Sequence, residues 1–318
     1  MSLFTRPALL IFAFATSFSQ QLNAQSVGTF SEVEVDVFAD VAYGHKDGLA
    51  LTFDVLVPQS QTGAAVIFVN SGGWRSPIMS WLTTDEDGSA RMRNDAEMLE
   101  GQERLAPNFS PKPLLERGIT TIIVRHGSRP RYTLPEIVSD IRLAVPVILD
   151  VTPRFGIDPD RVGLWGGSAG GHLALLGGTA IDQGEYLTES RIAAIVAYFP
   201  ISDLASMPAP APPPGTGAAM GMGMGMGGAA NLGLEPGMLG EVSPVTFVSE
   251  DDPPTLIIHG DRDMTVPLQQ GQLMHDTLSS AGVTTELIVV EGAGHGFTGE
   301  DSNMARAATL EWFERYLN

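Results

Sequence analysis

A serine within a glycine-rich turn is the strongest chemical feature of the sequence. Residues 162–176 read VGLWGGSAGGHLALL, so an apolar run leads into Gly-x-Ser-x-Gly around Ser168 and then into a helical pattern. A sharp turn between a strand and a helix would strain the backbone of Ser168 and raise its hydroxyl above the sheet. Side chains at positions 166 and 170 would collide with neighbouring elements, so both are glycine. Framed in this way, the motif predicts a serine nucleophile, whereas the bare motif also occurs in simple turns.

A serine hydroxyl is a poor nucleophile unless a base removes its proton. Residues 291–297, which follow an apolar run, read EGAGHGF. The small residues around His295 would let its ring approach Ser168, so we predict that His295 is the general base. Of the other histidines near these turns, we expect His172 to pack or hydrogen-bond behind the serine and His259 to be structural.

Three carboxylates could orient the histidine. Asp261 and Asp263 share the turn HGDRDMTVP at residues 259–267, and Asp203 follows another apolar run. We predict that Asp263 is the acid, because the loop must run past the end of its strand before it faces the histidine. Asp203 is the alternative acid, whereas Asp261 is expected to brace the loop by accepting hydrogen bonds from backbone amides.

Acyl transfer also needs hydrogen-bond donors for the negative charge that develops on the carbonyl oxygen. An early apolar run is followed by NSGGW, and we predict that the backbone N–H groups of Gly72 and Gly73 converge with that of Ala169 on this oxygen. Trp74 and His126 each follow the end of a strand beside the site, and we expect both to contact the substrate. For His126, a structural role in its loop is equally open.

Strands and helices alternate along the chain and would position these residues. Apolar or alternating segments predict eight strands, at residues 33–37, 49–57, 64–69, 120–124, 162–165, 192–199, 255–259 and 286–290. Helical patterns occur at about residues 135–150, 169–179, 268–281 and 303–316. Such alternation predicts a doubly wound α/β domain with a mostly parallel eight-stranded sheet, antiparallel strands first, and helices on both faces.

Three segments depart from this alternation. Residues 1–24 carry Arg6, a short apolar stretch and a small residue at the expected cut, which predicts a secretory signal peptide; an uncleaved anchor is the alternative. Residues 25–318 are then expected to form one domain with insertions at about 75–113 and 208–232. Because both insertions follow the carboxyl ends of strands, we expect them to be walls or a lid over the site.

The composition excludes several classes of function. Without cysteine, the chain has no disulfide scaffold, thiol nucleophile or all-cysteine zinc site. A net charge of −19 argues against nucleic-acid partners and against an anionic membrane surface. We expect no metal and no cofactor; the Met-Gly repeat at residues 220–226 could bind Cu(I), but a flexible lid or a loop without a role accounts for it more simply. After cleavage of the signal peptide, we expect a secreted or periplasmic protein that is not inserted in a membrane.

The turns around Ser168, Asp263 and His295 resemble those of the α/β-hydrolase superfamily, and within it the exported acetyl-xylan and feruloyl esterase-like hydrolases. The resemblance covers about residues 41–317 and includes GGSAGGHLA at residues 166–174. It implies the α/β-hydrolase fold and a cofactor-free serine carboxylester hydrolase with a Ser-Asp-His triad. The implied substrates are acetyl or feruloyl-type esters of carbohydrates.

The chain departs from the family pattern in two motifs. NSGG at residues 70–73 lacks the histidine of the family's oxyanion motif, and RHGS at residues 125–128 replaces its Tyr-Arg pair. Because the oxyanion donors are backbone amides, these differences concern the choice of substrate more than the catalytic step.

Two other functions on the same fold are the alternatives. A peptidase like the prolyl oligopeptidases usually carries a propeller domain, and no segment here is long enough to form one. A catalytically inactive glycan-binding protein would have no need of the complete set of Ser168, Asp263 and His295.

Overall fold

The computed structural model describes most of the chain from residue 26 onwards. The described residues are 26–30, 33–69, 72–76, 82–84, 90–92, 109–181, 184, 191–207 and 232–318. The predicted signal peptide lies outside them, as do most of the first predicted insertion and nearly all of the second.

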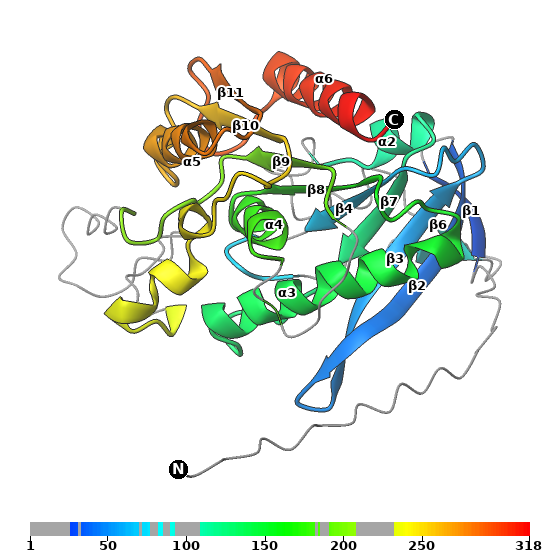
Figure 1. Ribbon diagram of the computed structural model, residues 1–318. Coiled ribbons are helices and arrows are strands. Elements are labelled where there is room, and N and C mark those ends of the chain that lie inside the picture. Colours follow the sequence, from blue (N-terminus) through cyan, green and yellow to red (C-terminus); the bar gives the residue numbers. More distant parts are fainter. Residues whose placement is uncertain are drawn as a thin grey trace, which may run out of the picture.

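A nine-stranded sheet forms the centre of the described chain (Figure 1). Its order is β1-β2-β3-β7-β4-β8-β9-β10-β11; the pairs from β1 to β7 are antiparallel and the remaining pairs are parallel. The strands are β1 (Ser26–Phe30), β2 (Val33–Lys46), β3 (Leu49–Pro58), β4 (Ala65–Val69), β7 (Thr120–Val124), β8 (Val162–Gly167), β9 (Ala194–Tyr198), β10 (Thr255–Gly260) and β11 (Thr285–Val290). All eight predicted strands are present, and β1 adds a ninth at the antiparallel edge.

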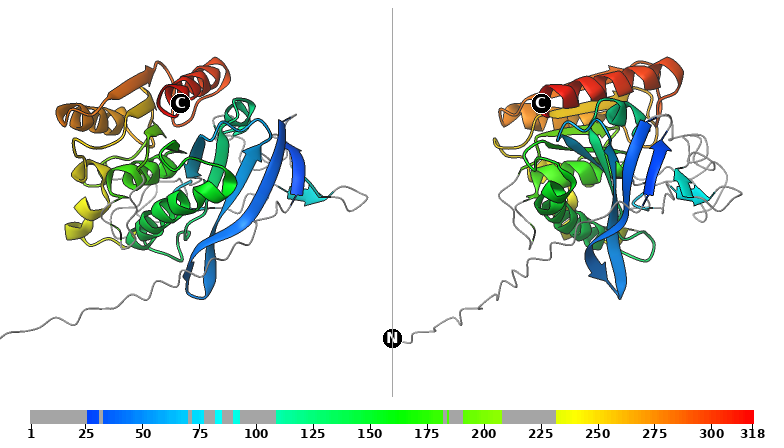
Figure 2. Two further views of the ribbon diagram at one scale, coloured as in Figure 1. Left: turned by 45° about the vertical axis from the view of Figure 1, so that its right-hand side comes forward. Right: turned by 90° about the vertical axis from the view of Figure 1, so that its right-hand side faces the viewer.

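Helices cover both faces of this sheet, and Figure 2 shows them on its two sides. On one face lie α3 (Leu134–Val151), α4 (Ala169–Thr179) and α5 (Leu268–Ser280), and on the other lie α2 (Lys112–Glu116) and α6 (Gly299–Tyr316). Short 3-10 helices are η2 (Thr152–Phe155), η5 (Pro236–Met238), η6 (Gly240–Val242) and η7 (Pro244–Thr246), and the strands β5 (Leu82–Thr84) and β6 (Ala90–Met92) pair separately. None of the helices in the described chain is both long enough and apolar enough to cross a bilayer.

The central strands explain why the sequence pattern was informative. Every residue of β4, β7, β8, β9 and β10 is buried, because helices cover both sides of them. Strands in such a position read as continuous apolar runs, which is how they were predicted. Their parallel pairing brings the carboxyl ends of β4, β8, β9, β10 and β11 to one edge of the sheet.

Strand β2 extends well beyond the predicted residues 33–37, and two irregularities that interrupt its alternating pattern explain why the rest was missed. The register against β3 shifts between Phe38 and Val41 and again between Ala42 and Gly44. Asp40 lies at φ 56°, and its N–H donates to Asp54 Oδ1 at 2.8 Å. A bulge of this kind breaks the period of two, so the pattern predicted only the first five residues of the strand.

Candidate active site

Ser168 occupies the turn between β8 and α4. Its backbone lies at φ 55° and ψ −123°, a region that a side chain other than glycine rarely adopts. A Cβ atom on Gly166 would overlap the backbone of Gly170, so the turn can close only around glycine. The Ser168 N–H donates to the Tyr198 carbonyl at 2.9 Å, which fixes the turn to the end of β9. The strained strand-to-helix turn is therefore present, with the serine partly exposed at its tip.

Hydrogen bonds join Ser168, His295 and Asp263 in a continuous chain. His295 Nε2 lies 2.8 Å from Ser168 Oγ, and His295 Nδ1 lies 2.7 Å from Asp263 Oδ2. These residues come from the ends of β8, β11 and β10, three strands that finish at the same edge of the sheet. An ionised Asp263 accepts a hydrogen bond from the Nδ1–H of His295, so Nε2 carries no proton and can accept the proton of the serine hydroxyl.

The acid is held in its ionised form by its own loop. Asp263 Oδ1 accepts backbone N–H groups of Thr265 at 2.8 Å and Val266 at 2.9 Å. Burial by itself would raise the pKa of Asp263, but N–H groups of His259 and His295 and the Val266 amide outweigh it and lower the pKa well below its usual range. The carboxylate therefore stays charged at any pH at which the protein would work. His259 Nε2 lies 2.8 Å from the Val266 carbonyl and 3.6 Å from Asp263 Oδ2. The buried His259 ring therefore stabilises the loop that carries Asp263.

The other two candidate carboxylates serve local structure. Asp261 Oδ1 accepts the Gly292 N–H at 2.6 Å, as a brace between the two loops would. Asp203 Oδ1 accepts the Ala205 N–H at 2.9 Å and lies 3.4 Å from the hydroxyl of Ser243. The carboxylate that the structure brings to the histidine is Asp263.

The predicted oxyanion donors are not equivalent. Strands β4 and β8 are neighbours, with Val69 opposite Gly166, so the loop after β4 starts beside the serine turn. The Gly72 N–H donates to the Arg75 carbonyl at 3.1 Å, and this bond corrects its prediction as a free donor. Gly73 follows at φ 60°, and the Ala169 N–H opens the first turn of α4, where backbone donors have no helical partner. Gly73 and Ala169 are left as the pair that could serve a carbonyl oxygen.

The two residues expected to contact the substrate lie beneath the surface. Trp74 is completely buried, and its indole Nε1–H donates to His172 Nδ1 at 3.1 Å, so its side chain has no face to offer a substrate. The His126 ring donates from Nδ1 to the Gly127 carbonyl at 2.6 Å, and its Nε2 is shielded from solvent without a partner among the described residues. Burial lowers the pKa of His126 to about 4, so its ring is neutral. These positions correct the prediction for Trp74 and favour the structural alternative for His126.

One aromatic contact of the site had no motif to indicate it. The Phe199 ring lies 4.6 Å from the ring of His295, centroid to centroid, and is itself completely buried. Phe199 is held at φ 37°, and its N–H donates to the Ile258 carbonyl at 2.8 Å. Its place directly after β9, at the edge where the other site residues gather, is the signal that could have found it.

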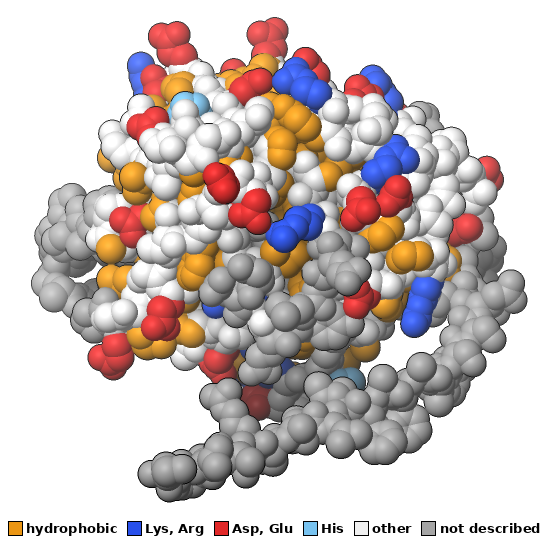
Figure 3. All heavy atoms as spheres, in the orientation of Figure 1, with side chains coloured by type: hydrophobic (Ala, Val, Ile, Leu, Met, Phe, Trp, Pro, Cys, Tyr) orange, Lys and Arg blue, Asp and Glu red, His pale blue; other side chains and the backbone are white. Residues whose placement is uncertain are grey.

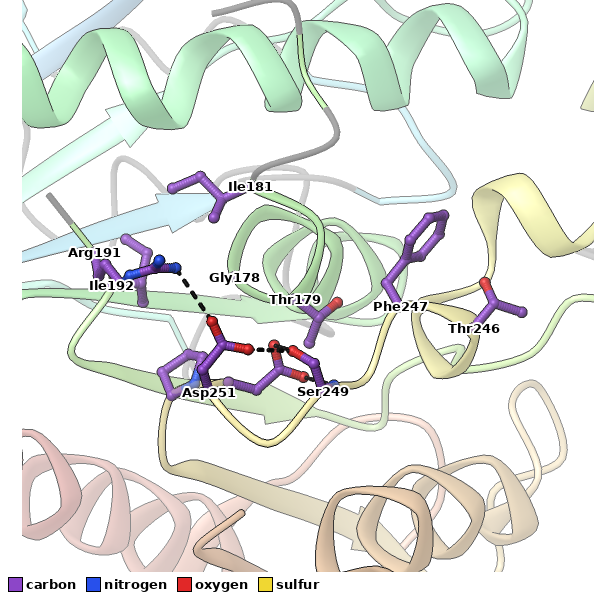
Figure 4. Close-up of a pocket in the computed structure, with 11 residues that line it drawn as sticks. Gly178, Thr179, Ile181, Arg191, Ile192, Thr246, Phe247, Ser249 and Asp251 are labelled. Carbon is purple, nitrogen blue, oxygen red and sulfur yellow. Dashed lines mark hydrogen bonds and ion pairs between the residues drawn. The ribbon is translucent and has the colours of Figure 1, made fainter. Parts of the chain in front are cut away.

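A cavity of about 400 Å³ lies elsewhere, between the end of α4 and the segments that precede β9 and β10 (Figure 4). Thr179 lines it and lies about 15 Å along the helix axis from Ala169, at 1.5 Å per residue. Its polar side chains are paired with one another: Arg191 with Asp251 at 3.5 Å, and the Ser249 hydroxyl with the same carboxylate at 2.7 Å. The cavity is therefore separate from the serine site.

Charged side chains of both signs are mixed on the surface of the described chain. On the face drawn in Figure 3, Lys and Arg side chains lie singly among acidic ones. Within the described residues, no group of three or more His, Asp or Glu side chains is arranged to hold a metal ion.

Comparison with known sequences relates this chain to esterases. The family model BD-FAE matches residues 87–278, a range that includes Ser168 and Asp263 and ends before His295. The chain is similar to the esterase LipQ of Mycobacterium tuberculosis (26% identical over 177 residues, 54% of this chain and 41% of the relative). It is also similar to the isoprenylcysteine alpha-carbonyl methylesterase ICME of Arabidopsis thaliana (23% over 257 residues, 76% of this chain and 53% of the relative). The chain thus spans about half the length, or less, of these curated relatives.

Solved structures of similar fold cover nearly the whole chain. A truncated carbohydrate esterase from gut microbiota superposes with a TM-score of 0.62 at 22% identity, over 88% of this chain and 96% of that one. The propionate-bound esterase Est2 of Thermogutta terrifontis gives a TM-score of 0.60 at 25% identity, over 90% and 93%.

Proposed function

The chain belongs to the BD-FAE family and has the α/β-hydrolase fold, and from this premise we propose that it is an exported serine carboxylester hydrolase. The observation that carries the proposal is the hydrogen-bonded chain Ser168–His295–Asp263, with separations of 2.8 and 2.7 Å. A nucleophile, a base and an acid in this arrangement activate a hydroxyl for attack on an acyl carbon.

The geometry supports a two-step reaction. Ser168 Oγ attacks the ester carbonyl carbon while His295 Nε2 takes its proton, and the N–H groups of Gly73 and Ala169 receive the developing oxyanion. His295 then returns the proton to the leaving alcohol, which yields an acyl-serine. Water then attacks the acyl carbon while His295 Nε2 takes its proton. The intermediate collapses by breaking the bond to Ser168 Oγ, which takes the proton back from His295 as the carboxylic acid product leaves. Asp263 holds the imidazole in the required tautomer and stabilises its charged form throughout.

For the substrate, we propose small acyl esters of carbohydrates, of the acetyl or feruloyl type. The motif resemblance supports this class, and a carbohydrate esterase is among the proteins of similar fold. Acetylated and feruloylated xylans are the substrates to compare. Release of acetate or ferulate from neither polymer, with simple aryl esters still hydrolysed, would overturn the carbohydrate assignment and leave the esterase.

The deciding experiment is hydrolysis of p-nitrophenyl acetate by the protein lacking residues 1–24 and by its Ser168→Ala variant. We expect kcat to fall by about 10⁴-fold or more in the variant, because the nucleophile is lost, while circular dichroism shows an unchanged fold. Equal rates in the two proteins would refute the proposal. In that case the absence of labelling by a fluorophosphonate probe would favour a glycan-binding protein, and cleavage of peptide substrates would favour a peptidase.

Export is the second part of the proposal and rests on the composition of residues 1–24. Expression of the full chain in a bacterial host should deliver a product to the periplasm or medium whose first residue is Gln25. Full-length protein retained in the membrane fraction would instead favour the uncleaved anchor.

A further inference from the structure

His172 connects three segments of the chain, namely the serine turn, the loop after β4 and η6, yet it is not one of the three residues of the Ser168–His295–Asp263 chain. It lies in the first turn of α4, where its N–H donates to the Ser168 carbonyl at 2.9 Å. Its ring is completely buried and makes one hydrogen bond from each nitrogen. Nδ1 lies 3.1 Å from Trp74 Nε1, and Nε2 lies 2.7 Å from the Val242 carbonyl in η6.

These partners determine which tautomer of His172 is present. The indole Nε1–H is a donor only, so Nδ1 must accept and carries no proton. The Val242 carbonyl is an acceptor only, so Nε2 must carry the proton and donate it. Burial lowers the pKa of His172 to about 4, and the ring is therefore neutral and holds both bonds throughout the neutral pH range.

The hydrogen bond to the Trp74 side chain connects His172 to the loop after β4. Trp74 directly follows Gly73, and its backbone lies at φ 58°, in the left-handed region that a bulky side chain disfavours. A strained conformation of this kind persists only where the surroundings hold it. The Trp74 carbonyl accepts the Arg129 N–H at 3.0 Å, and the indole is held by His172, with the two rings edge to face at 5.6 Å.

We infer that His172 is a positioning residue that sets the distance between the two oxyanion donors. One donor, Ala169, lies on the same helical turn as His172, and the other, Gly73, adjoins the tryptophan that His172 binds. Oxyanion donors must lie about 2.7–3.1 Å from the charged oxygen, and a displacement of about 1 Å can cost about 100-fold in rate. A single hydrogen bond between Trp74 and His172 therefore joins the two halves of the oxyanion hole.

This inference rests on the proposed function, and its test separates the two. The variants are His172→Phe, which keeps a ring but loses both bonds, and His172→Gln, whose amide can accept from the indole and donate to Val242. With p-nitrophenyl acetate, we expect kcat of His172→Phe to fall about tenfold or more with little change in KM, and His172→Gln to recover most of the loss. Trp74→Phe, which keeps an aromatic ring but removes the N–H donor together with part of the ring volume, should reproduce the loss.

The matched control is Thr152→Val. It deletes another buried hydrogen bond, from the Thr152 hydroxyl to the Leu149 carbonyl at the end of α3. It should lower the free energy of unfolding and leave kcat unchanged. If His172 only stabilised the fold, its variants would likewise lose stability and keep their kcat. Unchanged kcat in folded His172→Phe and Trp74→Phe would therefore overturn this inference but not the proposed function. Absence of hydrolysis by the unmodified protein would instead overturn the proposed function and the inference with it.

Discussion

Because two buried histidines are neutral in the folded protein, its free energy of unfolding depends on pH, and the size of this dependence can be calculated. Burial lowers the pKa of both His126 and His172 to about 4, from an ordinary value of about 6.5. In the unfolded chain each ring takes up a proton near its ordinary pKa, whereas in the folded protein each stays neutral until about pH 4. The unfolded state thus binds more protons within this window, so the free energy of unfolding falls as the pH falls.

The size of the effect follows from the shift. Each histidine contributes its full stabilisation above about pH 6.5 and loses about 3 kcal/mol by the time the pH is below about 4, since one pKa unit corresponds to about 1.4 kcal/mol. Between about pH 7 and pH 4.5 the loss is about 2 kcal/mol for each ring, or about 4 to 5 kcal/mol for the two together. That is a large part of the stability of an ordinary domain.

Urea unfolding followed by tryptophan fluorescence at these two pH values measures the loss. Carboxylates also titrate on the way down, so the comparison is between proteins: His126→Gln and His172→Gln should each lose about 2 kcal/mol less than the unmodified chain over the same interval. His275→Gln, at a partly exposed site on α5, is the control and should lose as much as the unmodified chain. The same loss in all four proteins would refute the reasoning, because the buried rings would then titrate as they do in water.

Three further predictions concern the acid, the turn and a buried ion pair. Asp263→Asn should lower kcat about 10⁴-fold by favouring the wrong tautomer of the base, whereas Asp203→Asn should leave kcat unchanged; the reverse result would make Asp203 the acid. Gly166→Ala should yield little folded protein, because the new Cβ atom would overlap the backbone of Gly170. A cooperative unfolding curve like that of the unmodified chain would contradict the geometry of the turn. Lys46→Met should lower the free energy of unfolding by about 2 kcal/mol in urea titrations, because it leaves the buried Asp140 carboxylate without its cation; a change below about 0.5 kcal/mol would show that the pair contributes little.

The fold was predictable wherever burial leaves a clear pattern. Residues 120–124 form β7 as predicted, because a strand covered on both faces is apolar at every position. The pattern fails at the antiparallel edge, where one face of a strand meets water. There, β1 (Ser26–Phe30) has no continuous apolar run, and the bulges of β2 after Phe38 break its alternation.

The sequence predicts those site residues that directly follow the carboxyl end of a strand. Ser168, Asp263 and His295 each follow an apolar run, and parallel strands carry their carboxyl ends to the same edge, so topology alone brings the three together. Which N–H groups remain free is decided by local turns, and the sequence does not encode them in a readable way. The bond from Gly72 to the Arg75 carbonyl is such a case, since it depends on four consecutive pairs of backbone angles.

The altered oxyanion motif and the buried tryptophan bear on one another. NSGG at residues 70–73 lacks the histidine that the resembling esterases carry, which removes a side chain that could have anchored the loop. The backbone donors of an oxyanion hole need no particular side chain, but they do need a fixed position. In this chain the indole of Trp74 supplies an anchor from the residue after the motif. Its partner His172 lies on helix α4, which begins directly after Ser168. Restoring the motif by Asn70→His should therefore raise kcat in Trp74→Phe more than in the unmodified chain; equal changes in both would show that the two anchors act independently.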